Sequence, residues 1–518
     1  MAKKTSVQKA FLSGNEALAR GAWEAGLTVA CAYPGTPSTE ILESLALYPE
    51  LDVQWSVNEK AAYEVAYSAA VGGVRSLFAC KHVGLNVAMD PLMTSSYTGV
   101  NAGFVAVVCD DPGMHSSQNE QDTRWAGIYA KLPILEPASP AEAKQFVAEA
   151  FAISEKYDTP VILRMTTRVS HSKEDVLLGQ RRPAEKRPLK PDIQKYVMVP
   201  AFARQRHALV EQRQLKLQKL SERSRLNKME LNDLSVGFIA GGVSYYYLKE
   251  ARPNASFLKL GFLYPFCDAK IKAFAGKVKK LVVVEELDPF IEDHIRQLGI
   301  KKAVFRHPSF RLGELGPGVI EDVIAGRPKK AVKLPPARPP RLCAGCPHWA
   351  TFSVLKKLGL FVAGDIGCYT LGTLPPTSAL HTCLCMGAGV TFNEGLRRAH
   401  PDGKIVGVIG DSTFIHAGIT GLINAAYNKA KGIIFILDNS TTAMTGGQNH
   451  PGTGLTIRGQ PTKTLDLKAL CLACGADNVD VMDPAGNVGQ LEELVRRRLS
   501  EDALTVIIAK HPCKLIKR

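Results

Sequence analysis

Two acidic turns in the last third of the chain have the residue types that hold a divalent cation and a diphosphate. Gly410-Asp411-Ser412 closes the apolar run KIVGVIGD (404–411), and Asp438-Asn439 closes the next one, GIIFILDN (432–439). In parallel α/β sheets, ligands gather at the carboxyl ends of strands, where helix N-termini direct amide donors at anions. Mg²⁺ takes a few carboxylate or amide oxygens and completes its shell with phosphate oxygens and water. The two turns therefore predict a magnesium–diphosphate site, although a Gly-Asp pair alone is common in turns.

Cysteines gather in the same part of the chain. They are Cys343, Cys346, Cys368, Cys383, Cys385, Cys471, Cys474 and Cys513. Where thiols stay reduced, clustered cysteines indicate metal binding or redox chemistry before disulfides. Four thiolates can hold an iron–sulfur cluster or a zinc ion, and buried cysteines without any ligand are also common. The residues alone leave these three readings open.

The N-terminal sequence and the charge balance narrow the class of protein. MAKKTSVQKA lacks the apolar stretch of a secretory signal, and no run of 18 apolar residues without a charge is present, so we expect a cytoplasmic protein without a membrane span. The net charge of +15 indicates an acidic partner or an anionic cofactor, and no recognisable nucleic-acid module accompanies it. Much of the excess lies in residues 204–228, which favours a solvated basic linker helix.

The elements that must position these residues alternate between strand-like apolar runs and helical patterns. In the first part of the chain the runs are LTVACAYPG (27–35), VRSLFACKH (74–82), GFVAVVCDD (103–111) and TPVILRM (159–165). This rhythm predicts an α/β fold with parallel sheets covered on both faces. Two breaks, one basic and one rich in proline, divide the chain. The predicted division is an α/β domain at 1–171, a basic linker with a helix at 172–233, an α/β domain at 234–330, a Pro-rich linker at 331–342 and an α/β domain at 343–518.

Several long stretches, in order along the chain, resemble one enzyme family. They are AYPGTPSTEI (32–41), NEKAAYEVAYSAA (58–70), KHVGLNVAMDPLM (81–93), DDPGMHSSQNEQDTR (110–124), CAGCPH (343–348) and GDIGCYTLG (364–372). With the acidic turns, they make the chain similar to the 2-oxoacid:ferredoxin oxidoreductases, and within that family to large subunits of the indolepyruvate type. The resemblance implies three parallel-sheet α/β domains, two of the thiamine-diphosphate-binding type and a transketolase C-terminal-like middle domain.

The resemblance also implies a cofactor and its contacts. Gly410-Asp411 with Asn439 resembles the thiamine diphosphate signature, in which Asp411, Asn439 and the backbone carbonyl of Thr441 bind Mg²⁺; Ser412 replaces the family's glycine. The other implied cofactor contacts are Gly410, Ser412, Asp438, Gly446, Gly447, Gln448, His348, Cys385 and Met386.

Two catalytic residues follow from the family. Glu59 stands where the family places the glutamate that binds the pyrimidine ring of thiamine and so lets the ring's own nitrogen act as the base; such a carboxyl works best when buried. Without the family, Glu59 is an ordinary acid in the first turn of a helix. Thr36 resembles the family threonine that contacts substrate or cofactor.

Polar loops near these residues are expected to line the substrate cleft, although turns contain the same residue types. The candidates are Lys81, His82, Asn86, His115, Ser116 and Ser117. Arg124 could receive a substrate carboxylate, bidentately.

The family draws the ligands of a proximal [4Fe-4S] cluster from positions that match Cys343, Cys346, Cys368 and Cys513, and Cys471 or Cys474 could replace the last. The sequence stops at Lys517-Arg518, where the family's large subunit continues into a ferredoxin-like domain. We therefore expect electrons to pass to a separate subunit, to ferredoxin or to another carrier. The family further implies a smaller beta-type subunit and pairing of two large subunits.

The implied reaction is oxidative decarboxylation of a 2-oxoacid, of the arylpyruvate type such as indolepyruvate, to acyl-CoA with CoA as co-substrate. Two alternatives remain: a non-redox thiamine-dependent decarboxylase that releases an aldehyde, and a non-catalytic subunit that binds the cofactor only. A subunit that only binds the cofactor has no need of Glu59, which favours an enzyme.

Overall fold

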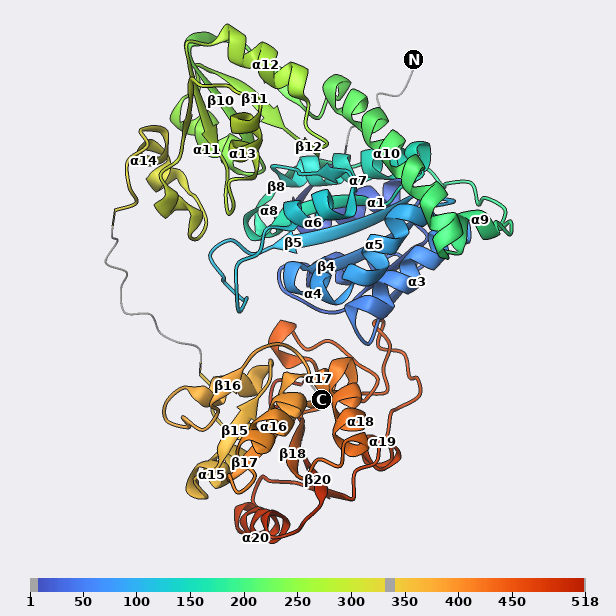
Figure 1. The fold of residues 1–518 in the computed structure, drawn as a ribbon, viewed down its shortest axis with the longest axis vertical. Helices are drawn as coiled ribbons and strands as arrows, with labels where there is room; N and C mark the ends of the chain where they lie inside the picture. Colours follow the sequence, from blue (N-terminus) through green and yellow to red (C-terminus); the bar gives the residue numbers. More distant parts are fainter. Residues whose placement is uncertain (1–7, 331–340, 517–518) are drawn as a thin grey trace. The chain divides into compact units, whose positions relative to one another are not determined.

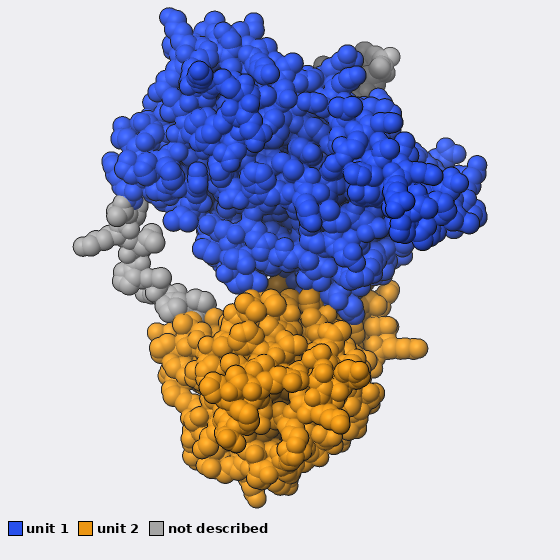
Figure 2. Space-filling model, in the orientation of Figure 1, with its two compact units in different colours: residues 1–332 blue, residues 333–518 orange. Residues whose placement is uncertain are grey.

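The computed structural model describes residues 8–330 and 341–516 and divides the chain into two compact units, residues 1–332 and 333–518 (Figures 1 and 2). Most of the predicted Pro-rich linker, residues 331–340, lies outside the described residues. Both units are built from parallel strands and helices, so the predicted α/β class with several largely parallel sheets is confirmed.

The first unit contains a seven-stranded sheet with the order β12-β6-β7-β5-β4-β2-β3, parallel except for the β12–β6 pair. Its strands are β2 (Val29–Ala32), β3 (Asp52–Trp55), β4 (Ser76–Lys81), β5 (Phe104–Asp110), β6 (Ile134–Leu135), β7 (Val161–Thr166) and β12 (Phe262–Tyr264). Its helices are α1 (Gly14–Glu24), α2 (Thr39–Leu45), α3 (Glu59–Val71), α4 (His82–Val87), α5 (Met89–Thr98), α6 (Thr123–Ala130), α7 (Pro140–Tyr157) and α8 (Thr167–His171). Every residue of β4, β5 and β7 is buried, as expected for parallel strands covered on both faces.

A second, five-stranded sheet in the same unit has the order β14-β13-β10-β11-β9. Its strands are β9 (Lys228–Glu230), β10 (Asp233–Gly241), β11 (Ala255–Leu260), β13 (Lys280–Val284) and β14 (Ala303–Phe305), and its helices are α11 (Ser244–Ala251), α12 (Asp268–Lys277), α13 (Phe290–Gln297) and α14 (Ile320–Ile324), with short turns η1 (Pro308–Arg311) and η2 (Pro317–Val319). One apolar core includes Ile134 and Ile162 of the first sheet and Ile239 and Leu258 of the second. The two sheets therefore pack as one body within this unit.

The segment predicted as a basic linker is tied into the unit at both ends. Strand β8 (Lys173–Leu177) pairs with β1 (Lys9–Ser13), β9 joins the second sheet, and α9 (Ile193–Tyr196) and α10 (Pro200–Arg223) lie between them. Arg206 and Arg213 of α10 are buried and donate to carbonyl groups of residues 96–98 at the end of α5. Cations at a helix C-terminus satisfy its free carbonyls. Two of the basic side chains thus stabilise the fold, and the prediction of a solvated basic helix is wrong for these two.

The second unit is a six-stranded parallel sheet with the order β16-β15-β17-β18-β20-β19. Its strands are β15 (Phe361–Gly364), β16 (Thr382–Cys383), β17 (Ile405–Gly410), β18 (Gly432–Asp438), β19 (Asn478–Met482) and β20 (Leu504–Lys510). Its helices are α15 (His348–Lys357), α16 (Ala388–Ala399), α17 (Asp411–Thr413), α18 (Ile419–Tyr427), α19 (Leu467–Ala473) and α20 (Val488–Leu499), with short turns η3 (Cys368–Thr373), η4 (Phe414–Gly418) and η5 (Ala443–Thr445).

Alternate residues of β18 enter two separate cores. Ile433, Phe435 and Leu437 pack on one face of the sheet, and Ile434 and Ile436 pack on the other. This follows from the two-residue period of a strand buried on both sides. The central strands are thereby fixed in register, and the polar turns that follow them are brought to one edge of the sheet.

No described helix is long and apolar enough to cross a membrane.

Candidate cofactor site

Asp411 lies where β17 ends and links two strand ends. Its carboxylate accepts the backbone N–H of Ser412 at 2.9 Å and that of Ser440, beyond β18, also at 2.9 Å. The helix that follows Asp411 contains a π-helical turn, η4, a feature frequent at functional sites. The N-terminal end of this helix directs backbone amide donors toward the sheet edge where Asp411 lies.

His450 adds a second buried group to this corner. Its Nε2 lies 3.2 Å from Asp411 Oδ2, and its Nδ1 accepts the N–H of Gly452 at 3.2 Å. Burial raises the pKa of the Asp411 carboxyl, and His450 opposes that effect. His450 did not stand out in the sequence, because its partner lies 39 positions earlier.

The turn after β18 carries the remaining predicted magnesium ligands. Asn439 Oδ1 accepts the N–H of Thr441 at 3.3 Å, and Ser440 between them has a positive φ of 58°. A non-glycine residue in that region is uncommon and is found preferentially at functional sites. Asp411, Asn439 and Thr441 thus lie on neighbouring turns at one edge. Their carboxylate, amide and carbonyl oxygens are the ligand set that a hard cation prefers.

The glycines that follow close this turn into a short loop. Gly446 and Gly447 have φ values of 122° and 93°, which residues with side chains rarely adopt. They return the chain so that Thr442 forms a β-bridge with Gln448, and Thr441 Oγ1 donates to the Gln448 carbonyl at 3.4 Å. Thr442 also hydrogen-bonds Ser412 at 3.0 Å, which joins this loop to the turn after β17.

Asp365, which sequence reasoning missed, organises the neighbouring loops. The fully buried carboxylate accepts N–H groups of Ile366 at 2.7 Å, Gly387 at 3.1 Å and Gly389 at 2.7 Å. Burial raises its pKa to about 6, against the effect of these hydrogen bonds. It joins the end of β15 to the turn that contains Cys385 and Met386. A second Gly-Asp pair at a strand end, Gly364-Asp365, was the signal available in the sequence.

The four cysteines predicted as cluster ligands line one cavity. Its lining residues are Arg341, Leu342, Cys343, Cys346, Pro347, His348, Cys368, Leu371, Asn439, Ala443, Cys513, Lys514 and Leu515. Burial and the neighbouring thiols raise the pKa values of Cys346 and Cys368 to about 11. The Cys513 N–H donates to the Asn439 carbonyl at 2.9 Å, so this cavity adjoins the turn of the predicted magnesium ligand.

The other predicted cluster candidates lie elsewhere. Cys471 is buried and Cys474 partly buried in the apolar core beneath α19, and neither lines the four-cysteine cavity. Burial lowers the pKa of His348 to about 4, so its ring is neutral at physiological pH. Among the described residues, no group of three or more His, Cys, Asp and Glu side chains is arranged to hold a single metal ion.

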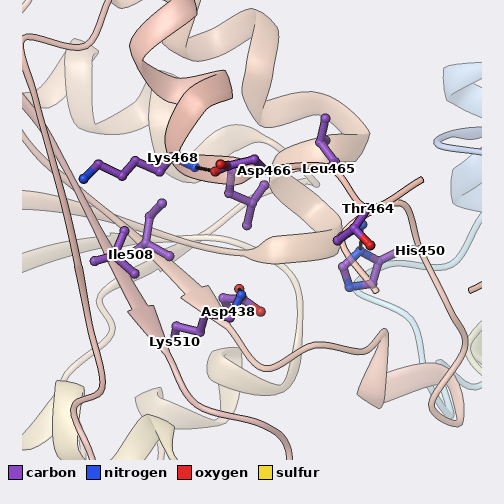
Figure 3. A pocket seen from close by; sticks show the side chains of 11 residues that line it. Asp438, His450, Thr464, Leu465, Asp466, Lys468, Ile508 and Lys510 are labelled. Carbon is purple, nitrogen blue, oxygen red and sulfur yellow. Dashed lines mark hydrogen bonds and ion pairs between the residues drawn. The ribbon is translucent and has the colours of Figure 1, made fainter. Parts of the chain in front are cut away.

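A separate cavity of about 370 Å³ lies beside Asp438 (Figure 3). It is lined by Asp438, His450, Gly452, Thr464, Leu465, Asp466, Leu467, Lys468, Val481, Ile508 and Lys510. Lys510 Nζ lies 3.3 Å from Asp438 Oδ2, and Asp466 accepts N–H groups from the start of α19. Its acidic and basic groups are thus largely engaged with one another or with the backbone.

In the first unit, Glu59 is the first residue of α3 and its side chain is buried. Its carboxylate packs against Gly84 of α4, where an added Cβ would come within 2.3 Å of Glu59 Oε1. Glycine at position 84 therefore leaves room for this carboxylate, and a larger residue there would displace the Glu59 side chain.

Part of the predicted substrate group gathers at the ends of β2, β4 and β5. Lys81 Nζ donates to the Ser116 carbonyl at 2.5 Å, and Ser116 Oγ donates to the Thr36 carbonyl at 3.1 Å. Burial lowers the pKa of Lys81 to about 8. His82 Nε2 lies 3.2 Å from the Asn119 carbonyl.

Three further predicted substrate residues have different surroundings. Asn86 is exposed on α4, and His115 Nε2 lies 3.5 Å from Glu314. Arg124 is 1% exposed; its guanidinium pairs with Asp122 and with Glu285 at 2.5 Å, and donates to two further backbone carbonyls. A guanidinium so enclosed does not meet a substrate carboxylate in this arrangement, contrary to the prediction.

Comparison with known proteins places the chain in a family. Residues 20–232 match the family described as pyruvate flavodoxin/ferredoxin oxidoreductase, thiamine diphosphate-binding, and residues 365–509 match the thiamine pyrophosphate enzyme C-terminal TPP-binding domain. The indolepyruvate oxidoreductase subunit IorA of Archaeoglobus fulgidus is 42% identical over 98% of this chain and 87% of its own length. The chain belongs to the IorA family. The family resemblance predicted from the sequence is thus confirmed.

Two further relatives and one solved structure also align with the chain. The IorA subunit of Pyrococcus horikoshii is 39% identical over 98% of this chain and 86% of its own length. The 2-oxoglutarate synthase subunit KorA of Methanothermobacter thermautotrophicus is 31% identical over 34% of this chain and 50% of its own. A solved 2-oxoglutarate:ferredoxin oxidoreductase from Magnetococcus marinus aligns with a TM-score of 0.49 and 17% identity over 62% of this chain and 63% of that one.

The family matches include the residues proposed for the thiamine site but only part of the four-cysteine group. The thiamine-binding matches include Glu59 and Lys81 in the first unit and Asp365, Asp411 and Asn439 in the second. Cys343, Cys346 and Cys513 lie outside both matched ranges. The matches thus support thiamine diphosphate as the cofactor of this IorA-family chain, and they do not extend to these three cysteines.

Proposed function

We propose that this chain is the catalytic large subunit of a thiamine-diphosphate-dependent 2-oxoacid:ferredoxin oxidoreductase of the indolepyruvate type. The reaction is oxidative decarboxylation of an arylpyruvate-like 2-oxoacid to acyl-CoA, with electrons passing through one [4Fe-4S] cluster to ferredoxin or another acceptor. The observation that carries the proposal is a single cavity lined by four cysteines and by Asn439. A cluster in that cavity would lie beside the turn proposed to hold the cofactor's metal ion.

The cofactor would be held by residues of the second unit. Asp411, Asn439 and the carbonyl of Thr441 would bind Mg²⁺, whose remaining positions are available to the diphosphate. The hydrogen bonds of Ser412 and Ser440 to Asp411 keep its carboxylate oriented toward this edge. Thiamine diphosphate, when bound, supplies the carbanion and the electron sink that the decarboxylation needs.

Glu59 would act on the cofactor's pyrimidine ring. Its buried carboxyl would hold a proton at the ring nitrogen, and Gly84 leaves the space that this carboxyl occupies. Lys81, held by Ser116, would offer a positive charge to the substrate carboxylate below its pKa of about 8. Thr36, which accepts from Ser116 through its carbonyl, belongs to the same group.

Cys343, Cys346, Cys368 and Cys513 would hold the cluster, which accepts one electron at a time. We also propose a smaller beta-type partner subunit and pairing of large subunits, as the family implies, with CoA as co-substrate.

Iron analysis of anaerobically purified protein tests the redox reading. We expect about four irons per chain and an EPR signal after dithionite reduction. Cys513→Ser should remove most of the iron, whereas the matched control Cys474→Ser, in the core beneath α19, should retain it. Zinc in place of iron would contradict this proposal and favour the non-redox decarboxylase. The same conclusion would follow if the protein contained neither metal and released an aldehyde in the absence of an electron acceptor.

A further inference from the structure

A second cavity adjoins the four-cysteine cavity on the side of Cys513. It has a volume of about 480 Å³ and is lined by Gly345, His511, Pro512, Cys513, Lys514 and Ile516. Cys513 and Lys514 line both cavities. One of the proposed cluster ligands therefore borders an open hollow of the second unit.

The residues around this hollow are basic or apolar. Arg341 and Lys514 are exposed, as are Leu515 (70%) and Ile516 (37%), and none of the residues that line either cavity is acidic. We call Arg341, His511, Lys514, Leu515 and Ile516 the exit surface. An apolar centre with a charged rim is the usual make-up of a protein interface.

Lys514 is placed over the loop that carries the first two cysteines. Its Nζ donates to the Ala344 carbonyl at 3.0 Å, and the loop turns at Gly345 with a φ of 74°. A Cβ at Gly345 would lie 3.2 Å from Lys514 Nζ, so glycine leaves the space that the ammonium group occupies. Cys343, the residue before Ala344, is itself exposed. A positive charge and a proposed cluster ligand thus reach solvent side by side.

Two acidic groups next to the exit surface already have basic partners. Asp483 accepts from His511 Nδ1 at 3.0 Å, and Asp438 pairs with Lys510 on the side of the Figure 3 cavity. Lys514 and Arg341 therefore dominate the charge of the rim. The net charge of +15 for the whole chain also attracts negatively charged molecules, at longer range.

We propose that the exit surface is the docking site of an acidic one-electron carrier protein. This inference rests on the proposed function, because it needs a cluster behind Cys343 and Cys513. Each docking event would transfer one electron from the reduced cluster to the oxidised carrier, with no proton or group transferred, so two carriers are reduced per 2-oxoacid. Electron-transfer complexes are small and rely on complementary charge for encounter, which suits a surface of this size.

Charge reversal of Lys514 tests the surface on the full chain with its partner subunit. Steady-state rates would be measured with a purified acidic ferredoxin and, separately, with methyl viologen, which is small and cationic. We expect Lys514→Glu to raise the KM for ferredoxin about 10-fold at low salt, with each rate normalised to the iron content and to the viologen reduction of the same preparation. Raising the ionic strength from about 0.02 to 0.3 M should raise the wild-type KM and affect the variant less.

Two further variants complete the test. Lys404→Glu reverses an exposed lysine just before β17, at the opposite end of the strands, and should leave the KM for ferredoxin as in wild type. Arg341→Glu carries the test if Lys514→Glu loses iron. A KM for ferredoxin within two-fold of wild type in the exit-surface variants would overturn the docking site. Absence of iron or of viologen reduction in the wild-type protein would instead overturn the proposed function.

Discussion

Asp110 and Asp111 are consecutive residues at the end of β5, but their side chains enter two differently built halves of the same sheet edge. Asp110 accepts from Arg164 Nε at 2.7 Å, in a half of the edge that the second sheet of this unit covers. Asp111 accepts from the backbone N–H of Ser116 at 2.9 Å and from Ser117 Oγ at 2.5 Å, in the half formed by β2, β4 and β5.

In the first half, buried charges neutralise one another across the two sheets. Arg164 also pairs with Glu136, and Arg124 pairs with Asp122 and with Glu285, which follows β13 of the second sheet. The second half is built differently. Lys81 is held by the carbonyl and hydroxyl of Ser116, and the carboxyl of Glu59 lies against Gly84.

The difference is informative because the position at the carboxyl edge is the same in both halves. Breaking a buried ion pair is costly, so charges that are paired with opposite charges serve the fold. Lys81 is held by the carbonyl and hydroxyl oxygens of Ser116, and the Asp111 carboxylate raises its pKa against the effect of burial. We therefore expect the buried ion pairs of Arg124 and Arg164 to serve the fold and Lys81 to serve the substrate site, although both groups lie at the same sheet edge.

The largest effect that this comparison predicts is that of Glu59→Gln. The amide has the size of the carboxyl but cannot exchange a proton with the pyrimidine ring, so turnover should fall about a thousand-fold. The affinity for thiamine diphosphate, measured by calorimetry with Mg²⁺ present, should change little. Glu64→Gln, an exposed position on the same helix that pairs with Lys60, is the matched control. Turnover at the wild-type rate in Glu59→Gln would place Glu59 with the structural charges.

The next largest effect is expected from Arg124→Met in the paired half. Removing the guanidinium takes the closest cation away from the buried carboxylates of Asp122 and Glu285, which should lower the free energy of unfolding by about 3–5 kcal/mol. Arg168→Met is the matched control, because Arg168 pairs with Glu314 at a partly exposed site and should cost at most about 1 kcal/mol.

Urea unfolding of both variants measures this difference, and substrate KM provides a second readout. If Arg124→Met unfolds like Arg168→Met but raises the substrate KM, Arg124 contacts substrate and the comparison fails. An unchanged KM in the folded fraction is the outcome we expect.

Whether a contact of the site could be predicted from the sequence depends on how far apart its two residues lie along the chain. Asp411 and Asn439 were predictable because each follows its own apolar strand, so the local pattern places them at one edge. The role of Arg124 could not be predicted, because its partner Glu285 is 161 positions away and follows a strand of another sheet. The contact of Lys81 with Ser116 spans 35 positions and depends on a loop whose path no local pattern determines.

The set of cluster cysteines could not be chosen from the sequence alone either. Spacing alone allowed Cys471 or Cys474 to replace Cys513, and only the packing beneath α19 separates them from the four-cysteine cavity. The α/β alternation was readable because strands buried on both faces are continuous apolar runs. The joining of the two sheets of the first unit by one core was not, since no periodicity shows which surfaces pack together.

The smallest predicted effect concerns Glu286, the neighbour of Glu285 in the paired half. Burial raises its pKa to about 7; Arg164 lowers it, Glu314 and Glu136 raise it further, and the N–H of Leu315 donates to it at 2.9 Å. Because the folded state then binds more protons than the unfolded state between about pH 4.5 and 7, the free energy of unfolding falls as the pH rises through that window. Above pH 7 the loss is complete and constant.

Glu286→Gln removes this titration and keeps a carbonyl oxygen for Leu315. Its advantage over the wild type should therefore grow from about 1 kcal/mol at pH 5 to about 3 kcal/mol at pH 8, as measured by urea unfolding at each pH. Contributions from the other titrating groups are common to both proteins and cancel in the difference. Parallel pH profiles for the two proteins would mean that Glu286 is ionised at little cost, and that Arg164 neutralises it as fully as it neutralises Asp110.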